Sequence, residues 1–255
     1  MPFEIATIPC LSDNYAFLAH DPATGATLCV DVPEAAPIKA ALEQREWTLS
    51  HVLLTHHHAD HVQGLDALLG DHPAQVIGAK ADAHRLPALD LQVSEGDEIT
   101  IGDQIGRVID VSGHTTGHIA VHFAASRAVF TADSLMALGC GRLFEGTPDR
   151  MWSSLSKLMA LPPETIVYSG HEYTLTNAKF ALTVDLGNSD LISRARQVET
   201  ARAEGRATVP TTLAEELATN PFLRAADPDI RAHLGMQEAT DAAVFAEIRA
   251  RKDAF

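Results

Sequence analysis

Cysteine is scarce in this sequence. Its 255 residues include three cysteines, Cys10, Cys29 and Cys140, which lie far apart and form no CxxC pair. An odd number of widely spaced cysteines does not suit a disulfide framework, so we expect reduced thiols. Each is best interpreted as a small, buried hydrophobic residue.

Basic residues are also few. The chain has 19 Lys and Arg against 34 Asp and Glu, a formal net charge of −15. The acid surplus is mostly N-terminal, because residues 1–173 carry 9 basic and 22 acidic side chains whereas residues 174–255 carry 10 and 12. Nucleic-acid binding depends largely on clustered Lys and Arg that release counterions, so this composition argues against a nucleic-acid partner.

Long apolar runs are absent. No stretch approaches the roughly 20 apolar residues that span a bilayer. The opening MPFEIATIPC has neither the basic nor the long apolar segment of a secretory signal. The apolar content of 46% and the charged content of 21% are ordinary for a folded globular protein. We therefore expect a cytoplasmic protein without membrane contact, and we expect a monomer.

Short apolar runs, separated by Gly, Pro and Asp, mark the strands of the first half. Residues 26–30 and 51–55 have the composition of buried strands. Residues 119–123 and 128–131 have the spacing of a hairpin.

The segments between these strands have apolar residues at helical spacing. This spacing predicts helices over Ala35–Arg45 and Val62–Leu69, the second closed by Gly70. Strands interleaved with helices indicate layers of sheet flanked by helices. We expect residues 1–173 to form this domain and residues 174–255 to form a smaller helical domain.

The segment THHHADH, residues 55–61, places four histidines and an aspartate after an apolar strand. In extended backbone, residues i and i+2 point to one side, so His56 and His58 can share a metal ion while His57 points away. Asp60 and His61 follow where the chain enters the helix expected at Val62, so they suit a second ion. So many polar ligands would be a costly choice for a structural turn, and the spacing indicates half of a two-metal site.

The missing ligands should lie at the ends of other strands. The candidates are His114 within SGHTTGH, Asp133 within TADS and His171 within SGHE. Each of them, taken alone, would more often be a hydrogen-bonded structural residue than a ligand. Nitrogen and oxygen donors suit Zn²⁺, Fe or Mn²⁺. The remaining histidines outside these segments are interpreted as ordinary ones: His20, His51, His72, His84, His122 and His233.

The HxHxDH motif at residues 56–61 resembles that of the metallo-β-lactamase superfamily. Further segments are most similar to the hydroxyacylglutathione hydrolases, also called glyoxalase II. These segments are Thr131-Ala132-Asp133, Gly139-Cys140-Gly141-Arg142, Gly170-His171-Glu172-Tyr173-Thr174, Thr208-Val209-Pro210, Thr219-Asn220-Pro221-Phe222-Leu223-Arg224 and Arg249-Ala250-Arg251-Lys252-Asp253. The resemblance covers essentially the whole chain. It implies an α/β fold, the four-layer αββα sandwich of the superfamily, with a C-terminal helical domain.

The resemblance also implies the site residues and the reaction. His56, His58 and His114 would bind one ion, Asp60, His61 and His171 the other, and Asp133 would bridge the two. Two divalent ions, most simply Zn²⁺ with Fe or Mn as alternatives, would supply a bridging hydroxide that attacks S-D-lactoylglutathione and releases D-lactate and glutathione. Asp60 and Asp133 would orient the water, with Asp31, Ser112 and His118 as supporting residues.

Glutathione binding is implied for Arg142, Tyr173, Arg249 and Lys252. A chain this acidic needs local Arg or Lys to hold a carboxylate-bearing peptide, although without the resemblance we would interpret these residues as surface cations and a half-buried tyrosine. Phe144 departs from the family, because many members have a tyrosine there that contacts the peptide. The loss of that phenol predicts weaker affinity for glutathione.

Three alternatives stay open. A mononuclear-iron persulfide dioxygenase of the same superfamily needs fewer ligands than this chain offers. A lactonase shares the metal ligands but not the helical C-terminal segment. A catalytically silent metal-binding protein would not need the candidate anion-binding residues. A β-lactamase is disfavoured by the missing signal sequence, and a nuclease by the net charge.

Overall fold

The computed structural model describes residues 1–255 and divides them into two compact units. The first comprises Met1–Val111 and Thr116–Ala132, and the second comprises Ser112–Thr115 and Asp133–Phe255. The three cysteines are reduced and buried, as predicted. None of the helices is long and apolar enough to cross a membrane.

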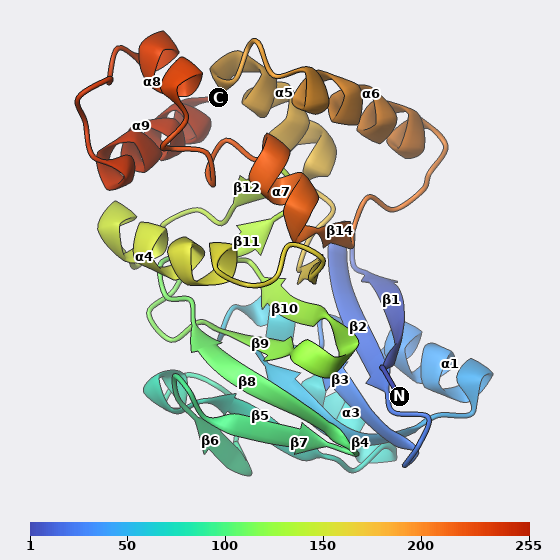
Figure 1. Cartoon of the computed structure of the whole chain (residues 1–255). Coiled ribbons are helices and arrows are strands. Elements are labelled where there is room, and N and C mark those ends of the chain that lie inside the picture. The colour runs from blue at the N-terminus through green and yellow to red at the C-terminus, as the bar shows by residue number, and fades with distance from the viewer. The chain divides into compact units, whose positions relative to one another are not determined.

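A six-stranded mixed sheet in the order β1-β2-β3-β4-β5-β6 organises the first unit (Figure 1). The first three strands pair antiparallel, and β3 to β6 pair parallel. Because β3 and β4 are parallel neighbours, the segments that follow them leave the sheet at the same edge. The strands are β1 (Glu4–Cys10), β2 (Asn14–His20), β3 (Ala26–Val30), β4 (Thr48–Leu54), β5 (Gln75–Ala79) and β6 (Leu91–Val93).

Four further strands of the first unit follow in sequence and pair antiparallel with their neighbours: β7 (Glu98–Ile101), β8 (Gln104–Asp110), β9 (Ile119–Phe123) and β10 (Ala128–Ala132). The hairpin predicted over residues 119–131 is confirmed. Phe17 of β2 packs against Phe130 of β10 with ring centroids 5.8 Å apart, and Phe130 packs edge-on against Phe123. The contact between Phe17 and Phe130 packs the sheet of β7 to β10 against that of β1 to β6, as in a sandwich.

Short helices connect and cover the strands of the first unit: α1 (Ala35–Arg45), α2 (Ala59–Val62), α3 (Leu65–Asp71) and the 3-10 turns η1 (Lys80–Asp82) and η2 (Ala124–Ser126). Buried residues of β1 to β5 form one core with Ile38, Leu42, Leu65 and Leu68 of α1 and α3. The helix predicted over Ala35–Arg45 is confirmed.

The single helix predicted over Val62–Leu69 is wrong. The chain breaks into α2 and α3 at Gly64, whose amide donates to Val32 O at 2.9 Å. A Cβ at Gly64 would lie 2.9 Å from both Val32 O and Ala35 N, so the break needs glycine for this close approach. Gly70 does not end the helix, because α3 continues to Asp71.

The second unit consists mainly of helices: α4 (Pro148–Met159), α5 (Thr174–Val184), α6 (Ser189–Ala203), α7 (Leu213–Thr219), α8 (Pro228–Leu234) and α9 (Asp241–Ala254). It also holds two short antiparallel pairs, β11 (Leu135–Met136) with β12 (Gly139–Cys140) and β13 (Ile166–Ser169) with β14 (Thr211–Thr212). Helices α5 and α6 lie side by side (Figure 1). The helical texture predicted after residue 174 is therefore present, interrupted only by β14, while the domain boundary at residue 173 stays a prediction.

Side-chain caps fix where the helices of the second unit begin. The hydroxyl of Thr147 accepts from Arg150 N before α4, and Asn188 Oδ1 accepts from two amides of α6. Thr212 and Glu215 form a capping box at α7. Each cap satisfies amides that the first helical turn leaves without a backbone partner.

Candidate metal centre

Asp31 fixes the backbone at the sheet edge where β3 and β4 end. Its side chain is buried, and its backbone is left-handed with φ +57°. Oδ1 accepts from Thr55 N at 2.8 Å, and Oδ2 accepts from Thr55 Oγ1 at 2.8 Å and contacts His61 Nδ1 at 2.8 Å. Both carboxylate oxygens are therefore committed to the protein. Asp31, His56 and His61 lie close enough to share an ion, but we interpret Asp31 as the residue that orients His61 rather than as a ligand.

The histidines after β4 are held by their Nδ1 atoms. His56 Nδ1 contacts Thr55 Oγ1 at 3.0 Å, and His61 Nδ1 contacts Asp31. The ring of His56 lies 4.8 Å from that of His58 and 4.2 Å from that of His61, centroid to centroid. His57 instead turns its Nδ1 to Asp82 Oδ2 at 2.8 Å. This is the alternation expected of extended backbone, and it makes Nε2 of His56 and His61 the nitrogen that would bind a metal ion.

Asp60 is positioned by a residue that the sequence did not single out. Asn14 Nδ2 donates to Asp60 Oδ2 at 3.0 Å and to its backbone oxygen at 3.1 Å. Asp60 Oδ2 lies 3.7 Å from His61 Nε2. Both Asp60 and His61 belong to α2, rather than to the approach to a helix at Val62 as expected. Asn14 lies 46 residues from Asp60, and no local pattern connects the two.

The second unit brings His114, Asp133 and His171 together. Asp133 Oδ2 lies 3.2 Å from His171 Nε2 and 3.6 Å from His114 Nε2, and all three residues are at least 95% buried. His114 Nδ1 contacts the backbone oxygen of Arg142 at 2.7 Å. Ala132, which directly precedes Asp133 in the chain, has φ +42°, a strained conformation for a residue with a Cβ. One carboxylate oxygen thus faces two imidazole nitrogens.

Gly141 makes this arrangement possible. A Cβ at Gly141 would lie 2.0 Å from Asp133 O and 2.9 Å from His114 Nδ1. A Cβ atom essentially never approaches another heavy atom this closely in real structures, so any side chain here would displace Asp133, His114 or both.

The donor sets fit divalent metal ions. The first unit assembles His56, His58, Asp60 and His61, and the second assembles His114, Asp133 and His171. All the donors are imidazole nitrogens and carboxylate oxygens, which suit Zn²⁺, Fe and Mn²⁺ better than a thiolate-preferring ion. Three of the histidines have Nδ1 held by a protein oxygen, as is usual for metal-ligating histidines. The chain therefore has a site for a divalent metal.

Cationic side chains gather around Asp253 in the second unit. Its Oδ1 lies 2.9 Å from Arg249 Nη2 and 3.3 Å from Arg142 Nε. Arg249 is 95% buried and donates to Cys140 O at 3.0 Å, so it is not the solvated cation that its sequence context allowed. Lys252 Nζ lies over the rings of Phe180 and Phe255.

Burial is the main reason why the pKa of Lys252 falls from 10.5 to about 8, and the neighbouring charge of Arg249 lowers it further. The Asp253 carboxylate acts in the opposite direction. Lys252 is therefore a cation whose charge changes close to neutral pH.

Two aromatic side chains border the histidines of the second unit. Tyr173 stacks on His171 with ring centroids 4.6 Å apart and planes 5° apart. Phe144 is 61% exposed, and it meets the ring of His114 edge-on at 5.3 Å. Both rings present apolar surface to solvent beside the ligands.

Two family models together match most of the chain. Residues 27–171 match the model of the metallo-β-lactamase superfamily, and residues 172–255 match that of the hydroxyacylglutathione hydrolase C-terminus. The chain is 68% identical to hydroxyacylglutathione hydrolase of Roseobacter denitrificans and 65% identical to that of Ruegeria pomeroyi, over the whole of each chain. The fold is thus the metallo-β-lactamase fold with a C-terminal helical region, as predicted. Within that superfamily, the chain belongs to the hydroxyacylglutathione hydrolase family.

Solved structures show the same fold. The structure of ETHE1 from Myxococcus xanthus aligns with a TM-score of 0.66 at 27% identity, covering 100% of this chain and 99% of that one. TTHA1623 in a di-iron-bound form aligns with a TM-score of 0.63 at 23% identity, covering 86% of this chain and 100% of that one.

A side chain at position 141 should weaken metal binding while the protein still folds. We expect Gly141→Ala to raise the dissociation constant for zinc by about tenfold or more, because the new methyl group displaces Asp133 and His114. Competition with a chromogenic chelator measures this constant. Gly187→Ala is the matched control, because a Cβ there meets no atom within 4 Å. Equal zinc affinity in both variants and the wild type would refute the steric argument.

Proposed function

We propose that this protein hydrolyses S-D-lactoylglutathione to D-lactate and glutathione. The observation that carries the proposal is the 68% identity, over the full length of both chains, to a relative named hydroxyacylglutathione hydrolase. The metal-binding residues at the sheet edge support a hydrolytic reaction. We further propose that the protein is a cytoplasmic monomer that works on this small molecule.

The proposed metal ligands fall into two sets. His56, His58 and His114 would bind one ion, Asp60, His61 and His171 would bind the other, and Asp133 would be shared by both. Support comes from the convergence of two imidazole nitrogens on Asp133 Oδ2 and from the Asn14 contact that holds Asp60. We propose Zn²⁺ as the resident metal, with Fe and Mn as alternatives that accept the same donors.

Divalent ions in this site supply a water of lowered pKa and a positive charge beside the thioester carbonyl. The chain's own carboxylates orient that water: Asn14 holds the Asp60 carboxylate, and the left-handed backbone of Ala132 aims Asp133. Asp31 keeps His61 in one ring orientation. With the metal bound, the water oxygen would bond to the carbonyl carbon as the carbon–sulfur bond breaks. One proton of the water would pass to the leaving thiolate and the other would go to solvent as the product carboxylate ionises, so no strong general acid is needed.

Recognition of the peptide is assigned to Arg142, Tyr173, Arg249 and Lys252. Glutathione carries two carboxylates, and a chain of net charge −15 needs concentrated positive charge to hold them. The cations around Asp253 provide it. Phe144 has no hydroxyl to offer the peptide, so its contribution is limited to apolar contact.

The first test is turnover of S-D-lactoylglutathione by the purified protein, with metal content measured on the same sample. We expect hydrolysis with about two metal equivalents per chain, because a two-metal site supplies the nucleophile. A metal-loaded protein without turnover would refute the proposal. A single iron with oxygen consumption on glutathione persulfide would instead identify the dioxygenase alternative, and a loaded protein inert to both substrates would identify a catalytically silent one.

If Arg249 and Lys252 hold the peptide, their loss should raise KM mainly for substrates that contain glutathione. Replacing Arg249 and Lys252 together by Ala should raise KM for a glutathione thioester far more than KM for a small thioester without the peptide. Steady-state kinetics with both substrates measures the difference. Equal effects on the two substrates would show that these residues do not hold the peptide.

The lowered pKa of Lys252 predicts a pH dependence of binding. Lys252 is charged below its pKa of about 8 and neutral above it, so attraction for an anionic substrate is present at pH 7 and lost by pH 9. We expect KM to rise by about tenfold over this range, the value of one charge-assisted hydrogen bond. Lys252→Arg keeps its charge throughout, so its KM should stay level from pH 7 to 9. A parallel rise in both proteins would assign the dependence to another group.

A further inference from the structure

The turn between β11 and β12 is unusual because it is fully buried. Residues 135–140 are all buried, and Leu138 has φ +57°. Peptide groups in such a turn are cut off from water, so each needs a protein partner. Only two residues, Ala137 and Leu138, lie between β11 and β12. Their peptide groups have partners in other segments of the chain.

Three side chains from the helical part of the second unit supply them. Asn220 Nδ2 donates to Met136 O at 3.1 Å and to Gly139 O at 3.0 Å. Asn177 Nδ2 donates to Ala137 O at 3.1 Å, and Glu216 Oε2 accepts from Leu138 N at 2.9 Å. Each residue from 136 to 139 is thus held by one of these side chains, and we call Asn177, Glu216 and Asn220 the turn clamp.

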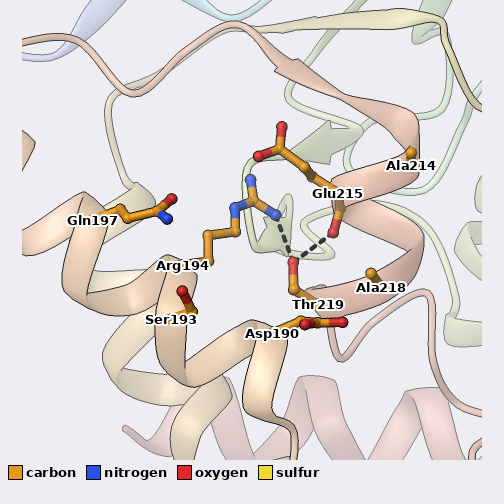
Figure 2. A pocket seen from close by; sticks show the side chains of 8 residues that line it. All are labelled: Asp190, Ser193, Arg194, Gln197, Ala214, Glu215, Ala218 and Thr219. Carbon is orange, nitrogen blue, oxygen red and sulfur yellow. Dashed lines mark hydrogen bonds between the residues drawn. The ribbon is translucent and has the colours of Figure 1, made fainter.

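The turn clamp is itself anchored by a buried ion pair. Glu216 is 0% exposed, and its Oε1 accepts from Arg194 Nη2 at 2.5 Å and from Thr211 Oγ1 at 2.9 Å. Arg194 Nη1 donates to Thr219 Oγ1 at 2.6 Å. Figure 2 shows Arg194 reaching from α6 to Thr219 beside a cleft of about 350 Å³. A buried charge pair with this many partners has one geometry, so the clamp is rigid.

The residues on either side of the turn belong to the proposed site. Asp133 lies two residues before β11, and the adjacent Ser134 O accepts from Gly141 N at 3.2 Å after β12. Arg142 O then holds His114 Nδ1, and Cys140 O holds the Arg249 guanidinium. A shift of the turn would therefore move a bridging carboxylate, a histidine ligand and a substrate-binding cation together.

We propose that the turn clamp positions the metal ligands Asp133 and His114 and the cation Arg249, and so couples metal binding to substrate binding. Asn177, Glu216 and Asn220 are positioning residues, because they act through the turn and contact none of the reacting atoms. The half of this inference that concerns Arg249 rests on the proposed function. The half that concerns metal affinity does not.

The test compares two asparagines of the second unit that both make buried or half-buried hydrogen bonds. Asn220→Ala removes both donations to the turn. Asn188→Ala is the matched control, because Asn188 caps α6 and donates to Ala218 O but does not contact the turn. Three quantities are measured on each: the thermal midpoint of the zinc-free protein, the dissociation constant for zinc, and KM and kcat.

We expect both variants to lower the thermal midpoint, and Asn220→Ala alone to raise the zinc dissociation constant by about tenfold or more and to raise KM. A loss of stability in both with zinc affinity and KM unchanged would overturn the proposal and leave the clamp a purely structural feature. If Asn220→Ala does not fold, Asn177→Ala decides by the same criteria, because it removes one bond to the turn. Zinc affinity is measured without substrate, so this result stands even if the protein does not turn over the thioester.

Discussion

The metal-binding residues of the first unit depend on the hydrogen bonds that the carboxylate of Asp31 accepts. Asp31 lies at the end of β3, in a left-handed conformation that a residue with a Cβ adopts only under constraint. Its two oxygens bind the backbone and side chain of Thr55 and the ring of His61. A buried carboxylate is costly unless all its hydrogen bonds are made, so these contacts hold the end of β4 and the start of α2 in one arrangement.

The two units use different groups to fix the orientation of their histidine rings. A metal-binding histidine usually has its other ring nitrogen held by a neighbouring group, and a protein oxygen does this for His56, His61 and His114. In the first unit the oxygen is the Asp31 carboxylate for His61 and the Thr55 hydroxyl for His56. In the second unit it is the backbone of Arg142 for His114. A backbone acceptor cannot be recognised from the residue type at its position, and where it lies depends on the path of the folded chain.

This difference decides what the sequence could predict. The strands, helix α1 and the HxHxDH segment have local patterns, and the pairing of His56 with His58 follows from strand geometry. Asn14 and the turn clamp have none, because their partners are 40 to 84 residues away and meet them only in the folded chain. The break at Gly64 was missed for a related reason: it is set by the approach of Val32, whereas helical periodicity reports only on the segment itself. Arginine in a helix is usually exposed, and only the folded structure, in which Arg249 packs against Cys140, shows that this one is buried.

Asp253 shows how this acidic chain holds Arg142, Arg249 and Lys252 near one another. Three cations placed together would repel one another and disfavour folding, and a shared carboxylate reduces that repulsion. A single oxygen of Asp253 accepts from Arg249 and lies beside Arg142. The group of four therefore stays net positive even when Lys252 is neutral, and protonation of Lys252 adds one further positive charge. Burial opposes that protonation, and the resulting pKa of about 8 leaves the last charge weakly held. If Lys252 binds the substrate as proposed, an arriving carboxylate would stabilise its protonated form, and substrate binding itself would add the charge that the fold alone holds only in part.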